Sequence, residues 1–280
     1  MHETQNVNYA TRITQHVTLS VVLPEVSMRY HFRPDELKAG LGPDQTPLDF
    51  LSCQRIELGG DRPEVTVETG PEEVALVCIG GQVEYTCEGN TGTVVYKDLL
   101  YLPWKSKALL RADDRAILMR IGAPSDRETD FVHLRFADVD QDPDKHKVFG
   151  TFEAHTYRDV YMYINEKFNA SRLLMGIGTG GTACWTVWPP HEHGDEKEEL
   201  YIYFDMGNAF GIQCVYETLD EPKFCGIVRE GDVVAVPRGF HPNVGCPGGR
   251  IAYVYAMAAR AAGQRDFMAL RFQEEFGDRF

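Results

Sequence analysis

Two stretches decide the fold of this chain: PPHEHGDEKEE at residues 189–199 and PRGFHP at residues 237–242. Histidines one residue apart on a strand point to the same face, because strand side chains alternate with a period of two. A carboxylate at Glu199 and a third imidazole at His241 can complete a site begun by His191 and His193. Three imidazoles and one carboxylate suit a divalent ion such as Zn, Mn, Fe or Ni. We therefore predict a metal protein whose chemistry lies in the last third of the chain.

The composition is that of an ordinary globular protein with an acidic surface. The chain has 280 residues, with 28 Lys and Arg against 42 Asp and Glu, for a net charge of −14. Such a surface repels phosphate backbones, so we expect no nucleic-acid partner. No apolar run is long enough to span a bilayer and no signal peptide is recognisable, and the seven cysteines are scattered. We therefore expect a cytoplasmic protein with reduced thiols and no membrane association.

Short alternating strands, separated by Gly, Asn and Asp, recur through most of the chain and predict an all-β sandwich or barrel. We divide the chain into five parts. Residues 48–125 and 157–262 are two β blocks, and the charged residues 126–156 join them as a linker. Residues 1–47 form an arm or edge strands, and residues 263–280 form a tail that could contain a short helix.

The two β blocks look like diverged copies of one unit. The segment LLYLPWKSK at residues 99–107 aligns with VVAVPRGFH at residues 233–241, which puts Lys107 where the second copy has His241. The first block has no His-x-His pair. We therefore predict an internal duplication with one working metal site.

The spacing of these residues resembles that of the cupin superfamily. Its two motifs match here at Gly181, His191, His193, Glu199 and Gly207, and at Gly231, Pro237, Gly239 and His241. The resemblance implies a double-stranded β-helix, or jelly roll, present twice as a tandem bicupin. The gap between His193 and Glu199 is longer than usual, which leaves Glu198 as an alternative ligand to Glu199. We prefer Glu199 as the ligand. Residues 201 and 203 lie on the same face of the strand as Glu199.

The residues at 189–195, 198–204 and 231–242 together resemble the 5-deoxy-glucuronate isomerase family of inositol catabolism. A sister family, 5-keto-4-deoxyuronate isomerase of pectin degradation, has the same plan. The resemblance implies a metal site in the C-terminal half only and a homo-oligomer. It also implies a uronic acid as the small-molecule substrate. The implied reaction is aldose–ketose isomerisation of 5-deoxy-D-glucuronate to 2-deoxy-5-keto-D-gluconate.

Such a reaction needs a general base and a cation for the substrate carboxylate. Candidates for the base are acidic or phenolic side chains near the ligands: Glu198, Glu192, Asp195, Tyr201 and Tyr203. Arg238 is our first candidate for the carboxylate, ahead of Arg172 and Lys223.

Two other classes of function fit the same ligands. Cupin dioxygenases use three histidines and one glutamate around Fe or Ni, so an O2-dependent reaction is one alternative. A non-catalytic sugar-binding bicupin is another. Storage bicupins usually lack intact ligands, so the complete set here favours an enzyme.

Overall fold

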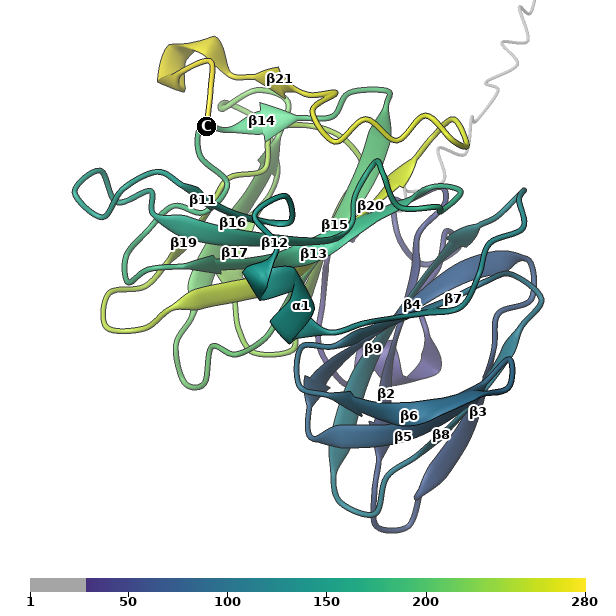
Figure 1. The fold of residues 1–280 in the computed structure, drawn as a ribbon. Helices are drawn as coiled ribbons and strands as arrows, with labels where there is room; N and C mark the ends of the chain where they lie inside the picture. The colour runs from purple at the N-terminus through teal and green to yellow at the C-terminus, as the bar shows by residue number, and fades with distance from the viewer. Residues whose placement is uncertain (1–28) are drawn as a thin grey trace, which may run out of the picture.

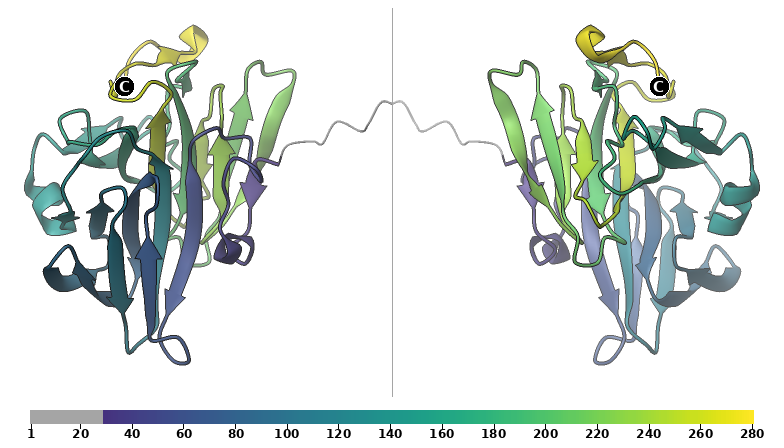
Figure 2. Two further views of the ribbon diagram at one scale, coloured as in Figure 1. Left: turned by 90° about the vertical axis from the view of Figure 1, so that its right-hand side faces the viewer. Right: turned by 90° about the vertical axis from the view of Figure 1, so that its left-hand side faces the viewer.

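The structure is a computed structural model that describes residues 29–280, and it is built almost entirely from β-strands (Figure 1). The prediction of an all-β fold is confirmed. Two β units lie against each other, and β21 and η2 of the tail lie at the end of the C-terminal unit away from the N-terminal unit (Figures 1 and 2). None of the helices in the described part of the chain has the length and apolar character needed to cross a membrane.

The N-terminal unit is a sandwich of two antiparallel sheets. One sheet has the order β10-β7-β4-β9-β2 and the other the order β3-β8-β5-β6. The bounds in chain order are β2 (Ser52–Leu58), β3 (Glu64–Glu68), β4 (Glu72–Gly80), β5 (Gln82–Cys87), β6 (Asn90–Val95), β7 (Leu99–Leu102), β8 (Lys107–Arg111), β9 (Ala116–Pro124) and β10 (Val132–Leu134).

The C-terminal unit has a large sheet of order β1-β18-β15-β20-β13-β12-β11, a small sheet β17-β16-β19, and the pair β14-β21. The bounds are β1 (His31–Phe32), β11 (His146–Phe149), β12 (Arg158–Ile164), β13 (Leu173–Gly180), β14 (His191–Glu192), β15 (Lys197–Tyr203), β16 (Gly211–Tyr216), β17 (Pro222–Val228), β18 (Val233–Val236), β19 (Asn243–Gly245), β20 (Ile251–Ala259) and β21 (Arg271–Phe272). The helical turns are η1 (Glu36–Ala39), α1 (Phe136–Gln141) and η2 (Glu274–Phe276).

The two units repeat one strand order. The run β7-β4-β9-β2 in the first corresponds to β18-β15-β20-β13 in the second. The pairing register of these strands shows which single residues correspond in the two units. Val74 on β4 lies opposite Leu102 and Gly122, as Glu199 on β15 lies opposite Val236 and Met257. The N-terminal unit therefore has a valine where the C-terminal unit has its predicted ligand carboxylate.

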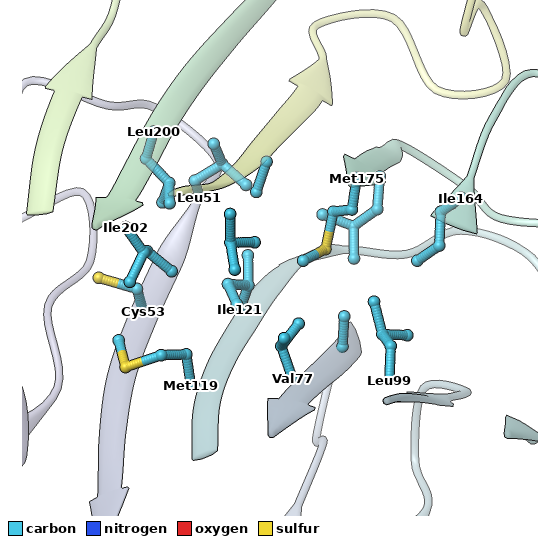
Figure 3. Close-up of a cluster of buried hydrophobic side chains, with 14 of the residues drawn as sticks. Leu51, Cys53, Val77, Leu99, Met119, Ile121, Ile164, Met175, Leu200 and Ile202 are labelled. Atoms are coloured by element: carbon cyan, nitrogen blue, oxygen red, sulfur yellow. The ribbon is translucent and has the colours of Figure 1, made fainter. Parts of the chain in front are cut away.

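The central strands of the two units each contribute one face to a shared core. Ala75 and Val77 on β4, and Leu200 and Ile202 on β15, belong to one buried cluster. Figure 3 shows side chains from both units meeting there. The alternate residues of each strand point the other way, into separate cores of the two sandwiches. The units are thus joined by a continuous apolar interface rather than by a flexible hinge.

Two buried glutamates bind backbone amides across this interface. Glu198 on β15 accepts hydrogen bonds from the N–H groups of Asp49, Phe50 and Leu51, at 2.7, 2.9 and 2.7 Å. These residues lead into β2 of the other unit. The arrangement satisfies three backbone donors with one buried carboxylate, which is a strong charge-assisted interaction.

Glu73 on β4 makes the reciprocal contact. It accepts hydrogen bonds from the N–H groups of Ser171, Arg172 and Leu173, at 2.7, 2.6 and 2.8 Å, where the chain enters β13. Glu73 and Glu198 precede Val74 and Glu199 and so occupy matching places in the repeat. We call this pair the carboxylate clamps.

The connecting segments are more ordered than the sequence suggested. The predicted linker 126–156 contains β10, α1 and β11, and these two strands extend the sheets of both units. Of the predicted arm 1–47, β1 adds an edge to β18, and residues 1–28 lie outside the described residues. In the tail 263–280, where a short helix was suggested, the only helical part is the single turn η2, and another part pairs as β21 with β14.

Candidate metal centre

Four predicted ligands converge at one end of the C-terminal unit. His191 lies on β14, His193 follows it, Glu199 is on β15, and His241 follows β18. One nitrogen from each histidine lies within 4.8 Å of the others. Glu199 Oε2 lies 3.0 Å from His241 Nε2 and 3.3 Å from His193 Nε2. All four residues are buried.

The backbone orients two of the imidazoles. His241 Nδ1 lies 2.8 Å from the carbonyl oxygen of Gly239, and His191 Nδ1 lies 3.3 Å from that of Pro189. Donation from Nδ1 leaves the Nε2 lone pair free to bind an ion, as is usual for metal-ligating histidines. Gly239 has a φ of +94°, and a Cβ there would lie 2.6 Å from the carbonyl oxygen of Tyr216. Only glycine allows the turn that brings His241 inward.

The cluster contains buried polar atoms without hydrogen-bond partners among the described residues: Glu199 Oε2, His241 Nε2 and His193 Nδ1. The first two are close together but not oriented for a hydrogen bond. Leaving such atoms unpaired costs about 1–3 kcal/mol each. A cation bound between the carboxylate oxygen and the imidazole nitrogens would remove part of that cost, so the donor set fits a divalent ion.

The protonation states also suit an ion. Burial lowers the pKa of His191 well below its ordinary value, and burial also lowers the pKa of His193. Burial alone would raise the pKa of Glu199, but the imidazoles of His193 and His241 outweigh it and lower that pKa overall. Neutral histidines and an ionised carboxylate are the forms that bind metal.

A pocket opens onto this cluster. Tyrosines and apolar side chains make up much of its wall: Val160, Val187, Tyr201, Tyr253, Tyr255, Met257, Phe267, Leu270 and Phe280. Burial raises the pKa of Tyr253 to about 12 and the pKa values of Tyr201 and Tyr255 well above the ordinary value. These phenols are therefore protonated at neutral pH and can donate hydrogen bonds. The hydroxyl of Tyr255 is buried without a hydrogen-bond partner in the described structure.

The candidates for proton transfer are only partly brought together. Tyr201 lines the pocket, whereas the hydroxyl of Tyr203 is turned away and donates to Gln213 Oε1. Glu198 faces the other unit and is fully engaged as a carboxylate clamp, because neighbours on a strand point to opposite faces. It is therefore not placed to act as the base.

The remaining acidic and basic candidates lie outside the pocket. Arg238 is largely exposed and pairs with Asp195 at 2.6 Å. Glu192 pairs with Arg271 of the tail. Arg172 donates to the carbonyl oxygens of residues 259 and 260, and Lys223 is exposed.

Several residues that line this pocket were not predicted from the sequence. Arg158 on β12 lines it, and so does Phe280 of the tail. The alternation of Arg158 with Val160 was a usable signal, because both residues point to the pocket face of one strand. Nothing in the tail sequence indicated its position, which depends on pairing between β21 and β14.

Comparison with known proteins connects this geometry to sugar-acid isomerases. The KduI/IolB family model matches residues 38–274. The 5-deoxy-glucuronate isomerase of Shouchella clausii is 38% identical over 234 residues, which cover 75% of this chain and 81% of that protein. The 4-deoxy-L-threo-5-hexosulose-uronate ketol-isomerase 2 of Rhizobium meliloti is 23% identical over 191 residues, and the match covers 66% of this chain and 65% of that protein.

Solved structures show the same fold. An IolB-like protein from Salmonella typhimurium LT2 aligns with a TM-score of 0.73 at 20% identity, over 85% of this chain and 92% of that one. The oxalate decarboxylase of Bacillus subtilis, described with Mn(II) centres, aligns with a TM-score of 0.59 at 12% identity, over 90% and 82%. The fold is cupin-like, as the sequence resemblance predicted.

Proposed function

This chain belongs to the KduI/IolB family, and on that premise we propose that it is a metal-dependent isomerase of a uronic acid. The proposed reaction converts 5-deoxy-D-glucuronate to 2-deoxy-5-keto-D-gluconate. The observation that carries the proposal is the buried cluster of three histidines and Glu199, with unpartnered ligand atoms, at the base of a pocket. We propose that His191, His193, Glu199 and His241 hold one Zn, Mn, Fe or Ni ion.

Similarity to named relatives supports this substrate over the pectin-derived one. The relative named for 5-deoxy-glucuronate is 38% identical over 75% of this chain, whereas the ketol-isomerase of Rhizobium meliloti is 23% identical over 66%. Both names describe an isomerase of a uronic acid. The two relatives share the class of reaction and differ in the uronate that their names give.

The chemistry requires a proton to move between adjacent carbons while negative charge develops on a substrate oxygen. A bound divalent ion would supply Lewis-acid stabilisation of that charge. The protonated phenols of Tyr201 and Tyr255 line the pocket and can donate hydrogen bonds to the same oxygen. Met257 and Phe267 keep the surroundings apolar, which strengthens these interactions.

Tyr255 is the phenol best placed for this role. Its hydroxyl has no hydrogen-bond partner among the described residues, whereas Tyr203 already donates to Gln213. We therefore assign Tyr255 as a hydrogen-bond donor to the developing oxyanion. Tyr255→Phe should lower kcat roughly 100-fold, as expected for loss of one such donor. Tyr203→Phe serves as the matched control, because that phenol does not line the pocket.

Proton NMR of 5-deoxy-D-glucuronate in D2O tests the function. We expect the purified protein to convert it to the keto acid and EDTA to abolish the conversion. Restoration by added metal would exclude damage by the chelator. If metal-loaded protein leaves this sugar unchanged, the assigned substrate is wrong. Conversion of 5-keto-4-deoxyuronate instead would identify the sister reaction, and product formation that requires O2 would identify a dioxygenase.

A further inference from the structure

Arg158 is a buried cation in the wall of the pocket. It begins β12 and is 3% exposed. It alternates with Val160, and both residues line the pocket that contains His191 and Glu199. The protein as a whole carries a charge of −14, so an anionic substrate needs a local source of positive charge.

The neighbours of Arg158 leave its charge without a counter-ion. Its two terminal nitrogens donate to the carbonyl oxygens of Thr156 at 3.1 Å and Trp188 at 2.9 Å. The rings of Phe149 and Phe280 lie 5.2 and 5.3 Å from its central carbon. Among residues 29–280, no carboxylate lies within ion-pairing distance of this guanidinium.

A buried arginine without a carboxylate is energetically unfavourable. Desolvation of an ion costs several kcal/mol unless an opposite charge compensates for it. Burial accordingly lowers the pKa of Arg158. Two backbone carbonyls and two aromatic rings recover part of this cost, but none of them carries a formal negative charge. A buried charge of this kind in a pocket is a candidate for pairing with a charged ligand.

We propose that Arg158 binds the carboxylate of the sugar-acid substrate. The inference deepens the proposed function and rests on it for the identity of the acid. A guanidinium has five N–H donors in one plane, and two are used by Thr156 and Trp188. Donors remain in the plane of the guanidinium, which is the geometry that suits a carboxylate.

The carboxylate subsite lies next to the proposed ligands. The ring of Phe280 is 5.2 Å from that of His191 and also 5.3 Å from the Arg158 guanidinium carbon. The hydrogen bond from Arg158 to Trp188 ties the guanidinium to the segment that leads into His191. A uronic acid carries its carboxylate at one end and its reacting carbonyl at the other. The pocket thus has a cation for the carboxylate and proposed metal ligands for the carbonyl. Arg238 pairs with Asp195 at the surface and does not line the pocket.

Binding of two stable sugars tests this inference without relying on turnover. Isothermal titration of metal-loaded protein would compare D-glucuronate with neutral D-glucose. We expect wild type to bind glucuronate at least about tenfold more tightly, and Arg158→Gln to reduce that preference to about onefold, because a charge-assisted pair is lost. Arg158→Lys should retain part of the preference. Arg238→Gln should retain all of it.

Several results would overturn the inference. One is a wild-type protein that shows no preference for glucuronate, whether it binds both sugars equally or neither. Another is an Arg158→Gln variant, folded by its melting temperature, that keeps the full preference. A purely structural role for Arg158 would lower the melting temperature without changing the ratio of the two affinities.

The two proposals can fail separately. If the preference disappears in Arg158→Gln but 5-deoxy-D-glucuronate is not isomerised by wild type, the carboxylate subsite stands and the reaction is wrong. If wild type isomerises the sugar and Arg158→Gln leaves both the preference and KM unchanged, the reaction stands and the subsite is wrong. Arg158→Lys gives the same comparison if the glutamine variant does not fold.

Discussion

The two β units have the same strand order but different interiors. At matching places on β4 and β15, the N-terminal unit has Val74 in an apolar core and the C-terminal unit has Glu199 beside histidines. After β7 of the N-terminal unit, Lys107 pairs with Glu68 at the surface, whereas His241, after β18 of the C-terminal unit, is buried in the cluster. The comparison teaches that the scaffold alone does not make a site. A few polar side chains and a covering tail distinguish the two copies.

Other features are shared by both units. The carboxylate clamps occupy matching positions and join the units reciprocally. The apolar core between the units draws on the same faces of β4 and β15. We therefore expect changes to the clamps or to this core to affect stability similarly in either unit, and changes to the metal cluster to affect activity only through the C-terminal unit.

The largest expected effect is loss of a ligand. His241→Ala should reduce metal retention and lower activity by at least about 100-fold, because the ion supplies several kcal/mol of stabilisation to the reacting charge. Lys107→Ala, at the aligned position of the other unit, should leave both properties unchanged. Metal analysis and the NMR assay measure them. Equal losses in the two variants would contradict the claim that only one unit is active.

The next effect concerns the carboxylate clamps. Glu198→Ala and Glu73→Ala should each lower the free energy of unfolding by roughly 3–5 kcal/mol, because three backbone N–H groups at the interface lose a charged acceptor. Chemical denaturation measures the change, with the exposed Glu153→Ala as the control. If only one clamp variant is destabilised, the two units are not held together symmetrically.

Metal removal should have a smaller effect on stability. At a free metal concentration 100 times the dissociation constant, binding stabilises the folded state by about 2.7 kcal/mol, which corresponds to roughly 5–10 °C in melting temperature. EDTA should produce this decrease in the wild type. It should produce none in His241→Ala, whose site is already incomplete. A decrease of the same size in that variant would place the stabilising ion elsewhere.

The smallest effect tests the core between the units. Ile202→Val should cost about 1 kcal/mol, because it removes a buried methylene from the shared cluster (Figure 3). Ile227→Val, at a side chain that is 47% exposed, should change stability by less than about 0.5 kcal/mol. Denaturant midpoints would show the difference. Equal values would mean that the units do not depend on this core.

The sequence predicted the features that repeat along a strand or within a motif. Alternation identified the β units, and the motif spacing selected His191, His193 and His241, which the structure brings together. The same alternation favoured Glu199 over Glu198, and the structure places these two side chains on opposite faces of β15. The pattern can indicate which residues share a face or lie together, because the physical cause lies within a few residues of the pattern.

Features that depend on long-range pairing could not be predicted in this way. The position of the tail follows from pairing between β21 and β14, which the sequence of the tail does not indicate. The surroundings of Arg158 come from β11, the loop before β14 and the tail, so its burial in the pocket was not visible. Arg238 was chosen for its proximity in sequence to a ligand, but the turn at Gly239 leaves it at the surface, paired with Asp195.

The most direct test of the account is anomalous X-ray diffraction from a crystal of the metal-loaded protein. We predict one anomalous peak per chain, between His191, His193, Glu199 and His241, and no peak in the N-terminal unit. A peak at another position, a second peak in the N-terminal unit, or metal-loaded crystals with no peak among these four side chains would contradict the claim that one copy of the duplicated fold carries the metal chemistry.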